Sequence, residues 1–151
     1  MATSDGVQVT VKPSLKDLKK RQEKQLKKIA DMKEPMSKVA TLLDRWVQTN
    51  FKTEGGNVGG WAPFAIGGRR KKGGRIDTTA KLLQDTGRTR ASFLPFSSKN
   101  DAGIGSDLPH TKAHNEGHGN LPKRRMLPKA ADVLKEVRRL LESYHKRILS
   151  K

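Results

Sequence analysis

The chain has 151 residues, enough for one domain of ordinary size, and only 33% of them are hydrophobic and 5% aromatic, so we expect a small core. Its 32 lysine and arginine residues against 15 aspartate and glutamate residues give a formal net charge of +17, which favours polyanionic partners such as nucleic acid, or acidic protein surfaces. The absence of cysteine excludes disulfides and cysteine-based zinc sites.

The N-terminal segment, residues 1–12, is too polar for a secretory signal peptide, and no stretch of the chain approaches the roughly 18 apolar residues that span a bilayer. We therefore expect no membrane partner, and a protein that is made in a cytoplasm and stays soluble there. Val7, Val9 and Val11 alternate with other residues, a pattern that fits either a short edge strand or a flexible arm.

Two helices are predicted next. Ser14 is a suitable N-cap for a very basic helix, and Asp17 three residues later favours the positive end of the helix dipole. A thin stripe runs along this helix: Leu15, Leu18, Gln22, Leu26 and Ile29. Pro35 is expected to interrupt the helix, and a second one is predicted over about residues 36–51. Apolar residues at three- and four-residue spacing give the second helix a wide face that we assign to the core: Val39, Leu42, Leu43, Trp46, Val47 and Phe51.

A long glycine-rich loop is predicted over residues 52–77, because eight glycines lie between Thr53 and Gly74. The loop carries five positive charges within seven residues, here called the basic cluster: Arg69, Arg70, Lys71, Lys72 and Arg75. Such a cluster can contact phosphate groups through counterion release, or an acidic partner protein, or it can simply be solvated. We keep DNA or partner contact as the functional hypothesis.

The second half of the chain predicts a mixture of elements. A short helix is expected over residues 78–86, ended by Gly87, and a long amphipathic helix over about residues 129–149. Between them we predict strands at about residues 91–97, 102–108 and 111–115. The expected fold is a single α+β domain over residues 1–151, in which N- and C-terminal helices pack on a small antiparallel β-sheet beside the long basic loop.

The sequence offers no constellation that indicates catalysis. His110, His114 and His118 stand four residues apart, and on one face they could bind a metal, but Pro109 and Gly117 argue against a helix and ordinary surface or packing histidines are the simpler interpretation. No nucleophile is paired with a base and an orienting group. The glycine runs lack the ending of a phosphate-binding loop. We predict a non-enzymatic protein without cofactor, catalytic group or metal site.

Four short blocks stand in a definite order before the last helix. They are FKTEGG followed by GWAP (51–56 and 60–63), LLQDTGR (82–88), HTKAHNEG (110–117) and LPKRRML (121–127). Their order and spacing resemble the phage virion morphogenesis family, the tail completion or neck proteins of Mu-like and related long-tailed phages. In that family His110 would usually be tyrosine, a leucine-containing stretch would replace Arg88–Arg90, and a small residue and an aromatic one would replace Lys123 and Met126. These departures bear on packing.

The resemblance implies a virion protein at the neck or tail end, a ring subunit that joins head to tail around the DNA channel. Its expected partners are other copies of itself, in a ring expected to be a hexamer, neighbouring connector and tail proteins, and the packaged DNA. The block residues are then determinants of fold and interface: Trp61, Pro63, Gly87, His114, Gly117, Pro122, Arg124 and Leu127.

These residue types suit structural roles. Trp61 and Pro63 can anchor the glycine-rich loop, and Gly87 can end a helix in the left-handed conformation. Pro122 with Arg124 or Arg125 can position the last helix while pairing with a carboxylate.

Two other functions remain open. The charge alone supports a soluble nucleic-acid-binding protein, which would bind DNA as a monomer and have no stable place in the virion. A virus-encoded enzyme is the more distant alternative, and a tightly bound metal at the three histidines would support it.

Overall fold

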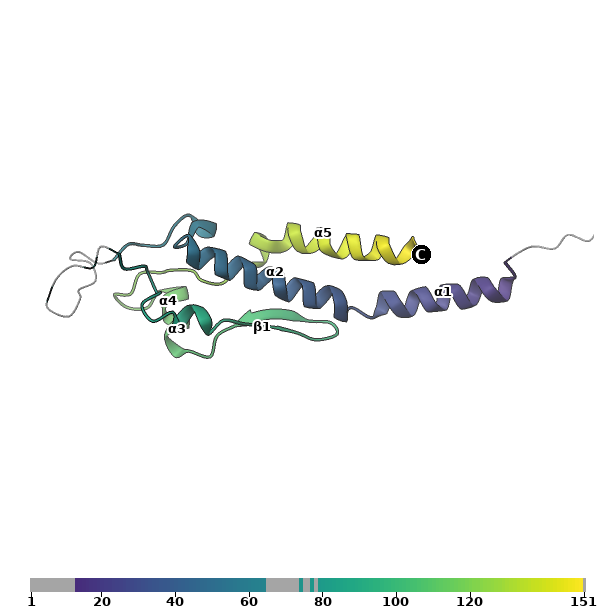
Figure 1. Cartoon of the computed structure of the whole chain (residues 1–151), viewed down its shortest axis with the longest axis horizontal. Helices are drawn as coiled ribbons and strands as arrows, with labels where there is room; N and C mark the ends of the chain where they lie inside the picture. Colours follow the sequence, from purple (N-terminus) through teal and green to yellow (C-terminus); the bar gives the residue numbers. More distant parts are fainter. Residues whose placement is uncertain (1–12, 65–73, 75–76, 78, 151) are drawn as a thin grey trace, which may run out of the picture.

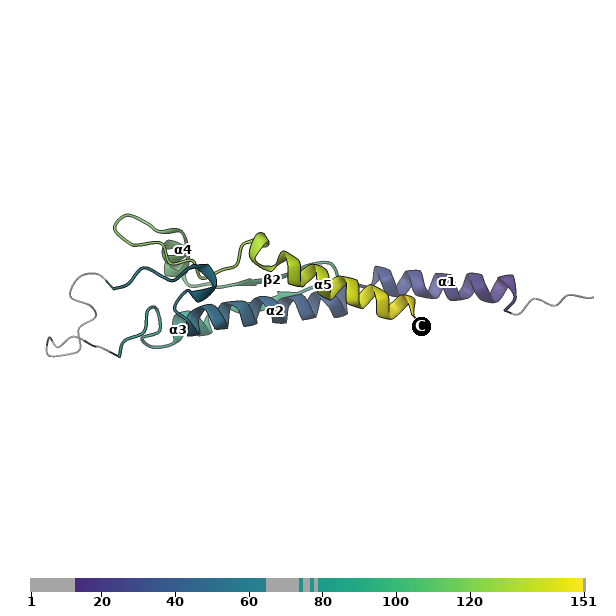
Figure 2. The same ribbon diagram turned by 90° about the horizontal axis from the view of Figure 1, so that it is seen from above.

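A long helix, α2 (Lys33–Lys52), forms the centre of the molecule (Figure 1). The computed structural model describes residues 13–64, 74, 77 and 79–150. Helix α5 (Ala130–Leu149) packs on one side of α2, and a two-stranded hairpin packs on another (Figures 1 and 2). The fold is therefore α+β, with helices at both ends and a small antiparallel sheet, as predicted.

Helix α1 (Leu15–Ala30) begins where the capping signal predicts. The Ser14 hydroxyl accepts a hydrogen bond from the Asp17 backbone N–H at 3.2 Å, and α1 has no buried residue. The helix continues the line of α2 and projects beyond the end of α5 (Figures 1 and 2). The predicted arm at residues 1–12, with Val7, Val9 and Val11, lies outside the described residues.

Helix α2 starts at Lys33, three residues earlier than predicted, and Pro35 lies buried inside its first turn. Proline is tolerated there because the N–H groups of a first turn have no acceptor within the helix. The prediction that Pro35 interrupts the helix is therefore wrong, and the break lies before Lys33. The predicted core face is confirmed for Val39, Leu42, Val47 and Phe51, whereas Leu43 and Trp46 are half-buried.

Strands β1 (Leu94–Ser97) and β2 (Ala102–Gly105) pair antiparallel, with Leu94 opposite Gly105 and Phe96 opposite Gly103. Both strands are shorter than predicted. A turn over residues 98–101 joins them, in which the Ser98 backbone N–H donates to the Asp101 carbonyl at 2.7 Å. The sheet has two strands in the described part of the chain, and the third predicted strand is absent from it.

The predicted helix over residues 78–86 does not form, since residues 79–86 make turns and Thr78 lies outside the described residues. Leu83 has a φ of +58°, which a right-handed helix cannot contain. The Leu82 N–H instead donates to the Glu54 carboxylate at 2.6 Å, and the Gln84 amide donates to the Phe51 carbonyl at 2.8 Å. Gly87 is left-handed (φ +72°), but it precedes the short helix α3 (Arg88–Ala91) rather than ending a helix.

The predicted strand over residues 111–115 is also wrong, because these residues form helix α4 (Pro109–Glu116). Pro109 occupies the first helical position, where its fixed φ and missing N–H suit a helix start. Gly117, with φ +79°, follows the last helical residue. The prediction of no helix, made from Pro109 and Gly117, is therefore wrong, because these two residues mark its start and its end.

The core lies between the C-terminal half of α2 and the segments that cross it. Its buried members are Val47, Phe51, Trp61, Leu82, Phe93 and Met126. The Phe51 ring meets the Trp61 ring edge to face at 5.1 Å between centroids, a favourable aromatic geometry. Helix α5, predicted correctly, buries Val133, Tyr144 and Ile148. None of the helices described here is both long and apolar enough to cross a membrane.

Candidate functional site

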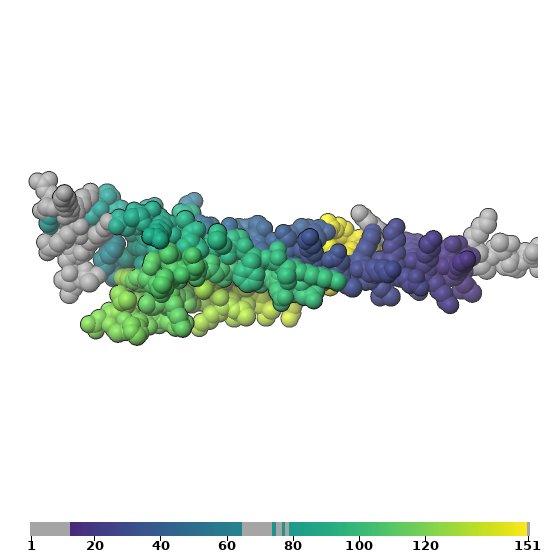
Figure 3. Space-filling view, turned by 90° about the horizontal axis from the view of Figure 1, so that it is seen from below, coloured from purple at the N-terminus to yellow at the C-terminus, as the bar shows by residue number. Residues whose placement is uncertain are grey.

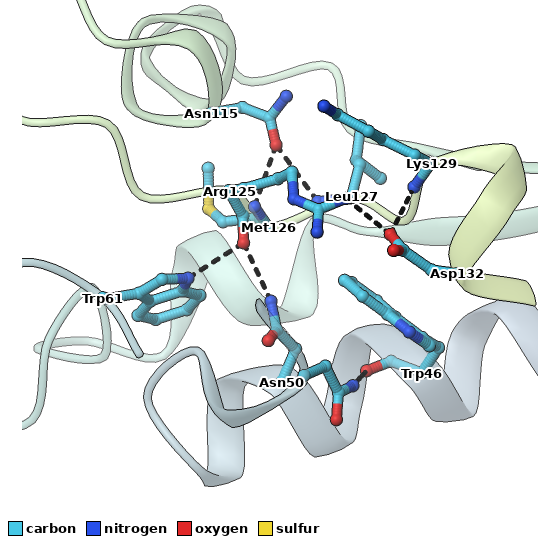
Figure 4. Close-up of polar contacts among 10 residues, drawn as sticks. Trp46, Asn50, Trp61, Asn115, Arg125, Met126, Leu127, Lys129 and Asp132 are labelled. Atoms are coloured by element: carbon cyan, nitrogen blue, oxygen red, sulfur yellow. Dashed lines mark hydrogen bonds and ion pairs between the residues drawn. The ribbon is translucent and has the colours of Figure 1, made fainter. Parts of the chain in front are cut away.

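The segment Arg124–Leu127, here called the junction, belongs to the last of the four sequence blocks and is bonded to residues of two others. Figure 4 shows its contacts with Trp61 and Asn115. The Arg125 carbonyl accepts a hydrogen bond from the Trp61 indole N–H and another from the Asn50 side-chain amide, both at 2.9 Å. Met126, directly after it, is fully buried in the core. The junction thereby ties the glycine-rich segment to the C-terminal part of α2.

Arg124 connects two further blocks. Its backbone N–H donates to the His114 carbonyl at 2.7 Å, at the end of α4. Its guanidinium donates to the Ala62 and Pro63 carbonyls, each at 2.8 Å. The residue is only 8% exposed, and this burial lowers the pKa of the Arg124 guanidinium. The Arg124 guanidinium, bonded to two carbonyls, holds the Trp61–Pro63 segment against the junction. These bonds and the Trp61 indole N–H bond are the contacts through which Trp61 and Pro63 can anchor the glycine-rich segment.

The last two junction residues are held by Asn115. Its side-chain oxygen accepts from the Met126 N–H at 2.8 Å and from the Leu127 N–H at 3.1 Å (Figure 4). Leu127 is partly buried against the core. Asn115 thus substitutes for a strand partner, which lets an irregular segment be buried with its backbone N–H groups satisfied.

The junction also positions α5. Arg125 forms an ion pair with Asp132 in the first turn of α5, and Asp132 accepts a further hydrogen bond from the Lys129 N–H at 2.8 Å (Figure 4). The Lys129 bond, together with the Arg125 guanidinium, lowers the pKa of the Asp132 carboxyl. The sequence left the pairing of Arg124 or Arg125 with a carboxylate open, and Arg125 is the one that makes it.

Gly117 and Pro122 bracket the turn that leads from α4 into the junction. Gly117 has φ +79° and ψ +141°, a region that is essentially restricted to glycine. A side-chain carbon added there would lie 3.3 Å from the Cβ of Lys123. Pro122 is half-buried. Between them His118 and Leu121 form an isolated bridge that closes the turn.

His114 is the histidine closest to the junction. Its Nδ1 atom is buried without a hydrogen-bond partner among the described residues. Burial, with the positive charge of Arg124 and the neighbouring His110, lowers the pKa of the His114 ring. An open hollow of about 290 Å³ lies beside it, lined by His110, Thr89 and Phe64 among others.

The three evenly spaced histidines are not brought together. The His110 and His114 rings lie one helical turn apart at 6.3 Å between centroids, whereas His118 follows Gly117 outside α4. Within the described residues no group of three or more histidine, aspartate or glutamate side chains could hold a metal ion.

Of the predicted fold and interface residues, the junction and its immediate neighbours include Trp61, Pro63, His114, Gly117, Pro122, Arg124 and Leu127. Gly87 lies apart, at the start of α3. Sequence reasoning missed Asn50, Asn115 and Asp132, whose roles depend on which backbone groups face them. The basic cluster (Arg69, Arg70, Lys71, Lys72 and Arg75) lies outside the described residues.

Comparison with known proteins gives one positive finding. The model of the phage virion morphogenesis family matches residues 14–146, which include all the helices and strands described above except the last residues of α5. No curated protein and no solved structure matches the chain.

Proposed function

The chain belongs to the phage virion morphogenesis family, and we propose that within this family it serves as a tail completion or neck protein, a ring subunit that joins the head to the tail. Its role in phage assembly follows from the family. The observation that carries the finer proposal is the match over residues 14–146, which contains the four blocks in their expected order.

The geometry of the blocks supports a structural role. The block side chains at the junction donate to or accept from backbone groups, as Trp61, Arg124 and Asn115 do. Such bonds hold irregular segments in place, and they leave no side chain of the junction poised as a nucleophile with a base. The residues that the family resemblance singles out therefore build a rigid body that can be placed in an assembly.

The surface supports assembly with other chains. Large apolar side chains remain exposed on α1, on the hairpin and on α5, among them Leu15 at 80%, Leu94 at 69% and Leu149 at 61%. A chain with so small a core gains stability when neighbours cover such residues. We propose a closed ring of identical subunits, expected to be a hexamer, because repeated head-to-tail contacts close into rings.

The net charge of +17 supports a position beside the DNA channel. Positive charge attracts DNA without sequence preference, which suits a ring through which any genome must pass. The acidic face of an adjacent connector or tail protein would be attracted in the same way. We propose that the protein remains in the virion, at the neck or tail end.

Electron microscopy of lysates from a phage that lacks this gene, beside the parent phage, tests the proposal. The expected result is DNA-filled heads and separate tails, with joined particles restored when the gene is supplied in trans. Normal joined particles in the mutant lysate would contradict a joining role.

The net charge also favours a second candidate, a soluble nucleic-acid-binding protein. That function predicts salt-dependent DNA binding by the purified monomer and no copies of the protein in purified virions. Quantifying the protein in virions by mass spectrometry therefore separates the two candidates.

A further inference from the structure

Helix α1 carries an apolar stripe that the body of its own chain leaves open. Leu15, Leu18 and Leu26, here called the leucine stripe, are 80%, 39% and 65% exposed. Their spacing places them on one side of the helix, while charged residues, most of them lysines, occupy most of the rest of its circumference. Isolated exposed leucines are ordinary, but three on one face of a projecting helix indicate a contact surface.

The C-terminal end of α1 and the link to α2 are hydrogen-bonded to α5. The Tyr144 hydroxyl of α5 lies 3.3 Å from the Lys28 carbonyl and 3.0 Å from the Asp31 carbonyl, within donating distance of both. The rest of α1 extends past the end of α5 (Figures 1 and 3). The bonds to Tyr144 fix the direction in which the leucine stripe is carried away from the body.

The hairpin offers a second exposed apolar surface. Leu94 and Phe96 of β1 and, opposite them, Gly105 and Gly103 of β2 share one face, here called the hairpin outer face. Leu94 is 69% and Phe96 60% exposed, whereas Ile104 on the other face packs against the core. The hairpin lies at the surface on the side of the molecule seen in Figure 3, and α1 continues beyond it.

The hairpin outer face has a shape that can receive a helix. The Phe96 ring covers Gly103, where an added side-chain carbon would lie 2.3 Å from the ring. No such cover exists at Gly105, where an added carbon would meet nothing within 4 Å. Leucine side chains can therefore lie over Gly105, between Leu94 and the Phe96 ring.

The charges of the two surfaces are complementary. Helix α1 has seven lysine and arginine residues against Asp17 and Glu23, a net charge of +5. Residues 92–107, which contain the hairpin, have Lys99 against Asp101 and Asp107, a net charge of −1. In a chain of +17, a segment with this charge does not repel α1.

We propose that the leucine stripe of one subunit packs on the hairpin outer face of the next subunit. The hairpin of the same chain is not the receiver, because α1 would have to reverse at the link before α2 and give up its bonds to Tyr144. The two surfaces differ, so the contact is heterologous and each subunit both gives and receives one. This inference rests on the proposed ring and names the contact that builds it.

Disulfide cross-linking tests the contact directly, because the chain has no cysteine of its own. One chain carries Gln22→Cys, within the leucine stripe, and a second chain of different mass carries Gly105→Cys on the hairpin outer face. Under mild oxidation we expect the mixed dimer, both in the concentrated purified protein and in lysates where particles assemble. Pairing Gln22→Cys with Glu142→Cys, an exposed position on α5, is the matched control.

A double variant, Leu18→Ser with Leu26→Ser, shows whether the leucines drive the contact. We expect it to lower the yield of the mixed dimer by about tenfold or more, the scale for exposing buried leucine side chains. No core residue is altered, so circular dichroism should show an unchanged fold. A yield no higher than that of the Glu142→Cys control, in both settings, would overturn the proposal. So would binding of α1 to anionic lipid vesicles that depends on the leucines while the mixed dimer is absent.

The two proposals fail in different ways. Joined particles that do not need the gene, together with an efficient cross-link, would refute the joining function and leave the self-contact. Particles that need the gene but give no cross-link would refute the contact alone.

Discussion

Arg124 illustrates how much of this fold depends on single polar side chains. It is 8% exposed, and it donates to two carbonyls of the Trp61–Pro63 segment that have no partner in a regular helix or strand. A buried cation is costly unless its donors are satisfied, and here carbonyl oxygens take the place of a carboxylate. Burial of the Arg124 guanidinium costs desolvation free energy, and its hydrogen bonds in return hold a glycine-rich segment in one conformation.

Replacement of Arg124 by methionine, which keeps most of the apolar volume, should lower the free energy of unfolding by about 2–3 kcal/mol. The Ala62 and Pro63 carbonyls lose their hydrogen-bond donor, which destabilises the fold. The variant also no longer has to bury a charge, but this gain offsets only part of the loss. Urea unfolding followed by circular dichroism measures the change. The control is Arg138→Met at an exposed position of α5, expected to stay within about 0.5 kcal/mol. Equal effects of the two substitutions would contradict the role of Arg124.

Glu34 should make stability depend on pH in acid. The hydrogen bond from Arg147 of α5, followed by that from Lys38, lowers the pKa of Glu34 from 4.5 to about 2. A carboxyl with a lowered folded-state pKa stabilises the fold above its unfolded value, and this stabilisation disappears as the pH falls from 4.5 towards 2.

In the variant Glu34→Gln that part of the pH dependence should vanish, so the two proteins converge in stability near pH 2. Unfolding curves at several pH values, at low and high salt, measure the difference. Because Glu34 is exposed, the difference at pH 7 should shrink as salt is added. A constant difference between the proteins from pH 7 to pH 2 would count against this assignment.

At the scale of elements, the exit from α4 shows why one glycine position is restricted. Gly117 must carry the chain from the end of a helix back into the junction, and its φ of +79° with ψ of +141° does so without a helical or ordinary left-handed turn. Residues with a side chain rarely adopt this region.

Gly117→Ala should destabilise the protein by about 1–3 kcal/mol, through backbone strain and close contact with Lys123. Thermal unfolding of the variant should show the loss directly. Gly105→Ala is the matched control, since φ there is not positive and an added carbon meets nothing within 4 Å. If Gly117→Ala is as stable as Gly105→Ala, the turn must be able to relax and the strain argument is wrong.

The same elements show what the sequence could predict. Ser14 and Asp17 mark the start of α1 by local chemistry, and the apolar spacing from Val39 to Phe51 marks the buried face of α2; both predictions are confirmed. The helix expected over residues 78–86 does not form, because the Glu54 carboxylate takes the Leu82 backbone N–H and Leu83 has a positive φ. Such long-range partners have no local signal.

In the candidate site, too, residues with a signal in the sequence could be predicted, and residues that depend on long-range partners could not. Trp61, Arg124 and Gly117 could be singled out because they belong to blocks whose order resembles a family. Asn50 and Asn115 could not, since an asparagine becomes important only when a particular carbonyl or N–H group faces it. Helix α4 is hard to predict because proline breaks a helix in its interior but favours one at the first helical position, where Pro109 lies.

At the scale of the whole molecule, the projecting helix α1 and the body of the fold have separate roles. The core cluster contains no residue of α1, so the projecting helix is free to serve assembly without weakening the body. The body itself is held by the junction, which joins α2, the Trp61–Pro63 segment, α4 and α5. Changes in α1 should therefore affect assembly, and changes in the junction should affect folding.

The basic cluster allows assembly to be separated from folding in the same way. Replacing Arg69, Arg70, Lys71, Lys72 and Arg75 by glutamine lowers the formal charge of +17 by five. Lysine and arginine side chains are seldom buried in a core, so the thermal unfolding midpoint should stay within a few degrees of the parent value. Joining of heads to tails, or retention of DNA in filled particles, should be impaired, because contacts with phosphates or with an acidic ring face are lost.

A second variant shows whether the location of the removed charges matters, or only the total charge of the protein. It carries glutamine at five exposed positions of α4 and α5: Lys112, Lys135, Arg138, Arg139 and Lys146. Its net charge equals that of the basic-cluster variant, so a general electrostatic effect would impair both equally. We expect infectious particles in lysates complemented with this control and a marked loss with the basic-cluster variant, counted as plaques and examined by electron microscopy. Normal titres with the basic-cluster variant would mean that it contacts neither DNA nor a neighbouring protein in the particle.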